Sequence, residues 1–513
     1  MDNRTVTSGL LFESSDWNFD TLSRTYDAIE EVALNDLGLD VYPNQMEIIS
    51  SEQMLDAYSS IGMPLMYRHW SFGKHFVHEE QAYRTGRRGL AYELVINSNP
   101  CISYLMEENT MAMQALVTAH AAFGHNHFFK NNYLFQQWTD AAAILNYMEF
   151  AKGYITRCEE MHGLTAVEAI LDSAHAIMDQ SVFRYRRPPR LSLARERERI
   201  RERLEYEERT FNDLWRTLPQ RNEANSSEVD RELLERKKSL NLPEENLLYF
   251  LEKNSLILEP WQREILRIVR IVAQYFYPQR QTKVMNEGCA TFVHYTIMNT
   301  LFDRGQLSEG AMLEMLASHS NVVFQPSFDD PRFSSINPYA LGFAMMQDIQ
   351  RICTEPTSED RDWFPDMAGN GDWRGTLKEA WANHRDESFI LQYLSPALMR
   401  KMRMFVLDDE SSSKHYQVSA IHDERGYENV RAVLAANLDV GANQPDIQVA
   451  DVDLLGDRHL RLQHTIHDGV VLSEGSRDAT MRHIRRLWGY DVSLAGVDGR
   501  SGRVVYEASI GEL

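Results

Sequence analysis

Apolar residues recur at three- and four-residue steps through most of residues 1–183, and this spacing predicts amphipathic helices. Clear examples lie at Thr21–Gly38, Thr110–Phe123 and Thr165–Ser181. The same period returns in residues 244–403, where the run ILRIVRIVAQYF is apolar over a broad face. A helix of that kind is buried on most sides, so these two segments predict the two parts of one large helical domain.

The segment between them, residues 184–243, has a different composition. Arg184–Arg209 holds ten arginines and six glutamates, and a polar stretch follows at Asn222–Ser227. This pattern predicts an exposed, charged and partly helical excursion from the helical domain. Two interpretations stay open: a face that is simply solvated, or a docking arm for an acidic partner.

After residue 403 the period changes from 3.6 to 2. The runs HYQVSAIH, DIQVADVDL, HLRLQHTI and VVYEAS alternate as strands do, and helical stretches at Tyr427–Asn437 and Ala479–Trp488 are interleaved with them. The predicted fold is therefore mainly α, with a small α+β domain at residues 404–513. Three histidines on its predicted strands are expected on the solvent face: His459, His464 and His467.

Composition narrows the class of protein. The 513 residues are 43% hydrophobic and 25% charged, which excludes a disordered chain, a fibre and a multi-span membrane protein. The net charge of −22 argues against general binding to nucleic acid. The four cysteines form no CxxC pair, and neither a secretory leader nor an apolar run long enough to span a membrane is visible. These features predict a cytoplasmic protein with reduced thiols.

The densest group of chemically active side chains is AHAAFGHNHFF, which holds His120, His125 and His127. The sequence has no P-loop, GxSxG or HExxH motif. In an unbroken α-helix, His120 and His125 would lie on different faces, but Gly124 offers an alternative in which the helix ends there in a left-handed cap. His125 and His127 could then fold back toward His120 to form part of a metal site. The alternative is that the histidines bond the last carbonyls of the helix.

Two glutamate–histidine pairs share a spacing of seven residues. Glu287 precedes His294, and Glu168 precedes His175. At 100° per residue, each pair lies on one helix face, about 10.5 Å apart along the axis. The pairs could line opposite sides of one central cavity or serve two metals, or each could be a buried hydrogen bond or a surface pair.

Together these segments predict a metal site in the helical core. The ligands expected are His120, His125, His175, Glu287 and His294, and the cation is Zn, Mn or Fe. A metal ion would activate a water molecule, and a nearby side chain would act as acid or base. Glu168 and His127 are the candidates for that second role. Gly288 would allow another helix to pack closely beside Glu287.

The runs NPCISYLMEENTMAMQALVTAHAAFGHNHFF, EPWQREILRIVRIVAQYFYPQRQTKVMNEGCATFVHY and INPYALGFAMMQDIQRI carry a resemblance to a known family. They resemble the stage V sporulation protein R (SpoVR) family, in particular the members from enterobacteria that form no spores. The resemblance covers about residues 10–400 and extends to the C-terminal domain. It implies a role in formation of the spore cortex, or in stationary-phase stress in other bacteria. It also implies partnership with a serine protein kinase and a von Willebrand A-type protein.

Two functions therefore stay open. The first is a metal-dependent hydrolase acting on an amide bond in a cell-wall precursor or a peptide. Asn286-Glu287-Gly288-x-Ala290 is similar to the second ligand-bearing helix of gluzincin peptidases, but the chain lacks the HExxH of their first helix. The second is a non-catalytic regulator or scaffold that works with the kinase and the von Willebrand A-type protein.

Overall fold

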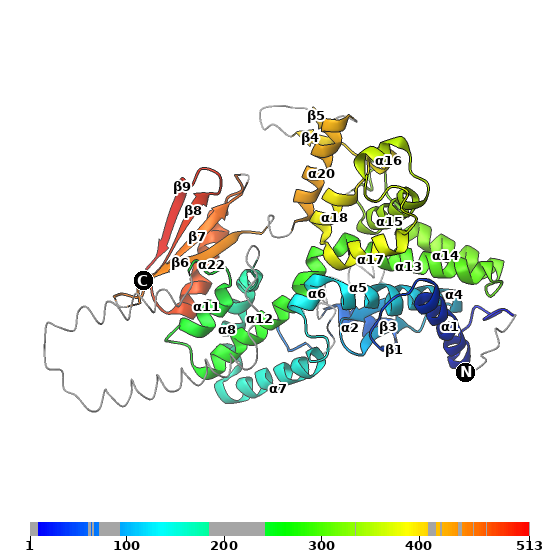
Figure 1. The fold of residues 1–513 in the computed structure, drawn as a ribbon. Helices are drawn as coiled ribbons and strands as arrows, with labels where there is room; N and C mark the ends of the chain where they lie inside the picture. Colours follow the sequence, from blue (N-terminus) through cyan, green and yellow to red (C-terminus); the bar gives the residue numbers. More distant parts are fainter. Residues whose placement is uncertain are drawn as a thin grey trace, which may run out of the picture. The chain divides into compact units, whose positions relative to one another are not determined.

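The structure is a computed structural model in which the chain forms two compact units (Figure 1). Unit 1 consists of Met1–Ala169 with Ile271–Asn443, and unit 2 of Ile170–Arg270 with Gln444–Leu513. The described residues are 9–59, 63, 66–70, 93–183, 242–333, 335–408, 417–420, 423–439, 444–454, 456–467 and 469–511. Nearly all of the charged segment predicted at residues 184–243 lies outside them. Within the described residues, no helix is both long and apolar enough to cross a membrane.

The N-terminal part of unit 1 combines helices with a small sheet. Its elements are α1 (Phe19–Glu31), the π-helix η1 (Val32–Asp36), β1 (Asn44–Ile49), α2 (Ser51–Ser59), β2 (Glu93–Ile96), β3 (Cys101–Met106), α4 (Met111–Thr118), the π-helix η2 (Ala119–His125), α5 (Asn126–Asn131), α6 (Tyr133–Trp138), α7 (Ile144–His162) and the start of α8 (Leu164–Ala176). The strands are ordered β1-β3-β2, with β1 parallel and β2 antiparallel to β3.

The sequence predicted helices in this part, and the three-stranded sheet was missed. The strands are only four to six residues long, and β3 buries four of its six residues, three of them in a row, so it lacks a clear alternation of apolar and polar residues. The sheet matters for the site because Glu93 is the first residue of β2 and pairs in register with Leu105 of β3.

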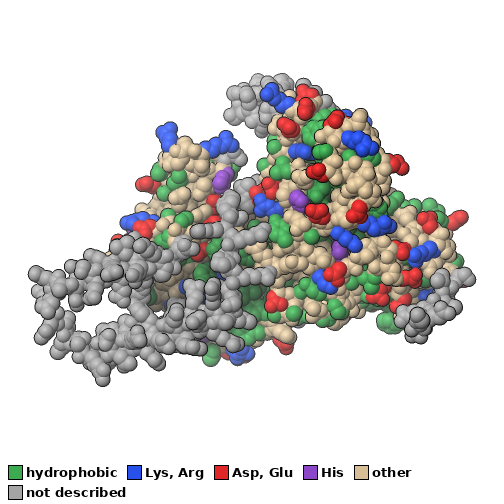
Figure 2. Space-filling model, in the orientation of Figure 1, with side chains coloured by type: hydrophobic (Ala, Val, Ile, Leu, Met, Phe, Trp, Pro, Cys, Tyr) green, Lys and Arg blue, Asp and Glu red, His purple; other side chains and the backbone are tan. Residues whose placement is uncertain are grey.

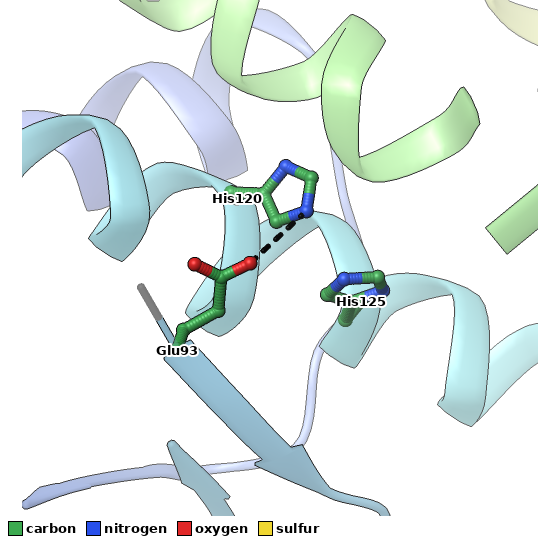
Figure 3. A group of neighbouring side chains, drawn as sticks. All are labelled: Glu93, His120 and His125. Atoms are coloured by element: carbon green, nitrogen blue, oxygen red, sulfur yellow. Dashed lines mark ion pairs between the residues drawn. The ribbon is translucent and has the colours of Figure 1, made fainter. Parts of the chain in front are cut away.

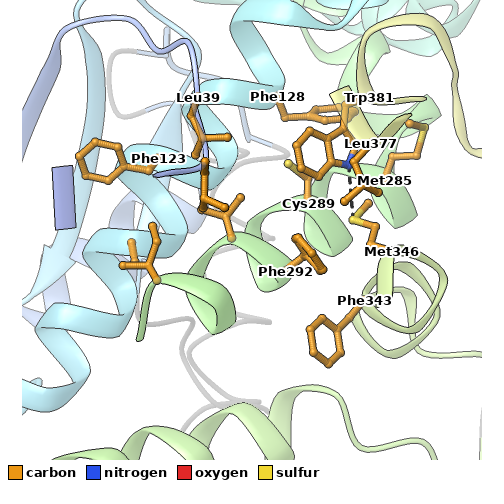
Figure 4. Packing of buried hydrophobic residues seen from close by; sticks show 14 of the residues in the cluster. Leu39, Phe123, Phe128, Met285, Cys289, Phe292, Phe343, Met346, Leu377 and Trp381 are labelled. Atoms are coloured by element: carbon orange, nitrogen blue, oxygen red, sulfur yellow. Dashed lines mark hydrogen bonds between the residues drawn. The ribbon is translucent and has the colours of Figure 1, made fainter. Parts of the chain in front are cut away.

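The second part of unit 1 is built around one buried helix, α13 (Lys283–Asp303). Around it lie the end of α12 (Pro260–Gln281), α14 (Glu309–Val322), α15 (Pro338–Thr354), α16 (Ser358–Trp363), α17 (Trp373–Asn383), α18 (Asp386–Tyr393), α19 (Pro396–Lys401), the pair β4 (Val406–Asp408) and β5 (Gln417–Ala420), and α20 (Glu424–Leu438). Side chains of α13, α15 and α17 interdigitate in the core (Figure 4), among them Phe292, Met346 and Trp381. Helix α13 is apolar on most sides because neighbours cover it on most sides.

Two glycine contacts bring the helices of this core unusually close. A Cβ on Gly124 of η2 would lie 2.4 Å from Cα of Ala290 on α13. A Cβ on Gly288 of α13 would lie 2.6 Å from Cα of Gly342 on α15. Both contacts exclude any side chain, so the glycines fix how η2, α13 and α15 cross. The close packing predicted beside Glu287 is present, and it holds the backbone that carries this carboxylate.

The start of α13 is capped from a distant part of the chain. The buried carboxylate of Asp386 accepts hydrogen bonds from the backbone N–H groups of Val284 and Met285, at 2.8 and 2.9 Å. We expect Asp386→Ala to destabilise the fold by about 1–2 kcal/mol, the usual cost of losing such a cap. Urea unfolding measures the change. The control, Glu387→Ala, removes only a partly exposed ion pair with Arg385 and is expected to cost under about 1 kcal/mol. Equal losses for the two variants would contradict the capping role.

Unit 2 pairs helices with a four-stranded mixed sheet. It contains the rest of α8, the 3₁₀ helix η3 (Met178–Gln180), α11 (Leu247–Asn254), the first half of α12, β6 (Asp446–Val452), β7 (Leu460–Ile466), α22 (Glu474–Trp488), β8 (Val492–Asp498) and β9 (Val504–Ile510). The order is β6-β7-β8-β9; α22 connects the parallel strands β7 and β8, and the other pairs are antiparallel. Trp488 is fully buried, with its ring 5.7 Å from that of Phe250.

The predicted fold class is confirmed: a mainly helical protein with a C-terminal α+β part. The solvent-face prediction was wrong for His464, which is 3% exposed because it points to the covered side of β7, where its Nδ1 lies 2.8 Å from the hydroxyl of Tyr506. Acidic and basic side chains lie interspersed on the face seen in Figure 2, although the chain as a whole carries a net charge of −22.

Candidate metal centre

A π-helical turn places two histidines on one face. Helix α4 continues into the π-helix η2, Ala119–His125. A π-helix has more residues per turn than an α-helix, so two residues five positions apart lie closer to the same face. The rings of His120 and His125 therefore lie with their centroids 4.7 Å apart. The alternative of a left-handed cap at Gly124 is not what the structure shows. The helix runs through this glycine, which lies against Ala290 of α13, and the wider winding aligns the histidines.

Two carboxylates from other elements face these histidines. Oε1 of Glu93, on β2, lies 3.6 Å from Nε2 of His120 (Figure 3). Oε2 of Glu287, on α13, lies 3.9 Å from Nε2 of His120 and 3.6 Å from Nε2 of His125. One ligand atom each from Glu93, His120 and His125 lie within 4.8 Å of one another. A strand, a π-helix and an α-helix thus converge on one point.

The spacing of these atoms suits a divalent cation. Ligands about 2.0–2.2 Å from a tetrahedral zinc lie about 3.4 Å from each other, so separations of 3.6–3.9 Å need only small adjustments. Oε2 of Glu287 is buried and accepts no hydrogen bond from any described residue. A buried carboxylate oxygen normally has a partner, so this oxygen, which faces two imidazole nitrogens, is a candidate ligand for a cation.

In each of the two histidines, the ring nitrogen that faces away from Glu287 has a polar partner of its own. Nδ1 of His125 lies 2.9 Å from Oδ1 of Asn286, the neighbour of Glu287 on α13. Since that oxygen only accepts, Nδ1 donates to it, and Nε2 is the nitrogen that faces Glu287. Nδ1 of His120 lies 2.9 Å from Nδ1 of His294. Such outer hydrogen bonds orient the histidine ligands of metal sites.

Burial is the main cause of the pKa shifts of His120, His294 and Glu93. Burial, followed by the neighbouring histidines, holds the pKa of His120 and of His294 well below the usual value. These imidazoles are therefore neutral at pH 7, the form that binds metal. Burial, and then the charge of Glu287, raises the pKa of Glu93 to about 8.

Comparison with known proteins places the chain in a family. The family profile described as "SpoVR like protein" matches residues 16–443, and the profile "SpoVR-like C-terminal domain" matches residues 445–499. The chain belongs to the SpoVR-like family. A relative from Escherichia coli (strain K12), "Uncharacterized protein YcgB", is 54% identical over 484 residues, which cover 94% of this chain and 93% of the relative. No solved structure matches the chain.

Four of the residues predicted for the site of this SpoVR-like protein come together: His120, His125, Glu287 and His294. His127 lies on α5, where its Nδ1 is 2.9 Å from the carbonyl oxygen of Asp40 and its ring meets Trp381 edge-on.

The second predicted glutamate–histidine pair lies on α8. Glu168 falls just before the boundary between the two units, and His175 falls in unit 2. Neither residue belongs to the group formed by Glu93, His120, His125 and Glu287.

Two members of the group were not predicted, Glu93 and His319. Glu93 is a single acid in the apolar run AYELVI, and an acid within an apolar strand is a usable signal because its burial requires a partner. His319 lies on α14, and its spacing after Met312 and Met315 puts it on the apolar face of that helix, which is a usable signal. Its Nδ1 lies 2.9 Å from Nε2 of His294.

Proposed function

We propose that this SpoVR-like protein is a metal-dependent hydrolase whose cation, Zn, Mn or Fe, is held by His120, His125 and Glu287. The observation that carries the proposal is the position of Glu287 Oε2, buried, without a hydrogen-bond partner among the described residues, and within 3.9 Å of both imidazole nitrogens. Two imidazoles with one carboxylate is a ligand set found in catalytic zinc sites, and it leaves a coordination position for water or substrate.

Glu93 is the acid–base residue in this proposal. A bound divalent cation supplies Lewis acidity and lowers the pKa of a water molecule that it holds. Glu93 Oε1 lies 3.6 Å from His120 Nε2, and one ligand atom of Glu93 lies within 4.8 Å of a ring nitrogen of each histidine. Glu93 therefore borders the cation position, while Glu287 Oε2 lies within 3.9 Å of both imidazoles. With a pKa of about 8, Glu93 is protonated at pH 7 without a cation; a bound cation would lower this pKa. The carboxylate would then accept the proton of the attacking water and return it to the leaving nitrogen as the C–N bond breaks.

The proposed substrate is an amide bond in a cell-wall precursor or a peptide. It follows from the family's link to spore cortex, combined with a site suited to activating water. The test is to load chelator-treated protein with Zn, Mn or Fe separately and to incubate each form with peptidoglycan fragments and with a peptide mixture.

Mass spectrometry is expected to detect hydrolysis products with at least one loaded form. The matched control, Glu93→Gln, keeps the size of the side chain and should lose about 100-fold or more of the turnover while still binding metal. Products formed equally by wild type and Glu93→Gln would contradict the assignment of Glu93. No products with any loaded form would contradict the hydrolase.

The regulator or scaffold function, with a serine protein kinase and a von Willebrand A-type partner, stays a prediction. The charged segment on which it depends, residues 184–243, lies almost wholly outside the described residues. Loss of partner recovery on deleting this segment would favour it.

A further inference from the structure

Three buried imidazoles form a continuous chain behind the candidate metal centre. Nδ1 of His120 lies 2.9 Å from Nδ1 of His294, and Nε2 of His294 lies 2.9 Å from Nδ1 of His319. The three residues come from η2, α13 and α14, and their exposed fractions are 4%, 2% and 7%. The chain therefore leads from the cation position to a helix that supplies no ligand.

Hydrogen bonding restricts the protons of this chain to two patterns. A 2.9 Å contact between two neutral imidazole nitrogens holds one proton, since one nitrogen must donate and the other accept. In the first pattern, His120 donates to His294 and His294 donates to His319. In the second, both bonds run the other way. A neutral imidazole carries one proton, so the direction of the bonds decides whether Nε2 of His120, the nitrogen that faces the carboxylates, carries it.

The two patterns differ in what His120 can bind. In the first, Nδ1 of His120 carries the proton, and its Nε2 presents a lone pair to a cation. In the second, Nε2 carries the proton and points toward Glu93 and Glu287, 3.6 and 3.9 Å away, as a donor that would exclude a metal. Apolar packing favours neutral rings throughout the chain, because the rings of Tyr295 and Phe343 lie 4.9 and 4.7 Å from that of His319.

We propose that His294 and His319 are positioning residues that set the tautomer of His120, so that cation binding reverses both hydrogen bonds and leaves His319 with its proton on Nε2. This inference rests on the proposed metal site. The protons balance: the proton on Nε2 of His120 leaves, the two shared protons move toward His120, and His319 takes one up on Nε2. Every ring stays neutral.

Nitrogen-15 NMR of histidine-labelled full-length protein tests the reversal, because protonated and unprotonated imidazole nitrogens have well-separated shifts. The metal-free and zinc-loaded forms are compared. In the loaded form, we expect His319 to be protonated on Nε2 and His294 on Nε2. A loaded form with His319 protonated on Nδ1 would overturn the inference.

A variant pair tests the effect on binding. His319→Leu removes the acceptor for His294 and is expected to weaken zinc binding about 10–100-fold, the usual cost of losing an outer partner. His319→Asn offers an amide oxygen to Nε2 of His294 and is expected to restore most of the affinity. Equal affinity in wild type and a folded His319→Leu would overturn the inference. If His319→Leu does not fold, the NMR comparison on the wild type still decides.

Different results would exclude the metal site and the positioning role of His294 and His319. Wild-type protein that binds no Zn, Mn or Fe would remove the metal site, and with it both proposals. Wild-type protein that binds zinc tightly, with unchanged tautomers in His294 and His319, would remove only the positioning role and leave the metal site in place.

Discussion

Replacing Glu287 with alanine is expected to weaken zinc binding by more than about 100-fold, with the fold retained. The reason is that Glu287 Oε2 lies within 3.9 Å of both imidazole nitrogens and has no hydrogen-bond partner among the residues that the structure describes. Outer partners of metal ligands are worth about 10–100-fold in affinity, so a direct ligand should exceed that range. Competition with a chelator of known affinity measures the change, and circular dichroism checks the fold.

Two matched variants sharpen this test. Glu93→Gln should lower zinc affinity by no more than about 10–100-fold, since Glu93 is assigned to proton transfer rather than to the cation. Glu168→Gln should leave affinity unchanged, because Glu168 lies on α8 and is not assigned to the centre. A Glu287→Ala protein that binds zinc as tightly as wild type would contradict the ligand assignment. If Glu93→Gln lost zinc binding and Glu287→Ala kept it, Glu93 would be the metal ligand and Glu287 the acid–base residue.

Gly288→Ala is expected to destabilise the protein by about 3 kcal/mol or more, at or beyond the upper end of ordinary overpacking. The added Cβ would lie 2.6 Å from both Cα and the carbonyl carbon of Gly342, so backbone rather than a flexible side chain must move. Because Gly288 follows Glu287 directly, the displacement of α13 from α15 should also move the carboxylate. Urea unfolding measures the stability loss, and zinc titration measures the effect on the site.

The control is Gly310→Ala on α14. There the nearest atom to an added Cβ is the hydroxyl oxygen of Ser308 at 4.0 Å. This replacement should stabilise the protein by about 0.5–1 kcal/mol, because alanine loses less conformational freedom than glycine in a helix. Similar stabilities for the Gly288 and Gly310 variants would show that α13 and α15 do not need their close approach.

Most of the residues of the candidate site could be predicted from the sequence, but the way the backbone brings them together could not. Histidines and an acid in apolar segments predict buried polar groups that need partners, and this reasoning found His120, His125, Glu287 and His294. It failed at η2, because periodicity arguments assume 3.6 residues per turn and put His120 and His125 on different faces. The π-helix removes that conflict, and it forms where Gly124 lets α13 approach.

Long-range convergence explains the remaining omissions. Glu93 reaches the centre from a four-residue strand whose position depends on pairing with β3, a contact that local pattern does not reveal. His319 reaches it only because α14 packs beside α13. By contrast, the C-terminal strands and α22 were predictable, because alternation along a half-covered sheet and a 3.6-residue period in a helix are local signals.

The measurement that tests the central claim most directly is the metal content of protein purified without a histidine tag or nickel. Mass spectrometry of wild type and of the double variant His120→Ala/Glu287→Ala gives metal per chain. We expect one equivalent of Zn, Mn or Fe in wild type, removable by a chelator and restored on addition, and none in the folded double variant. A fully folded wild type that contains no metal and takes up none of the three would contradict the account.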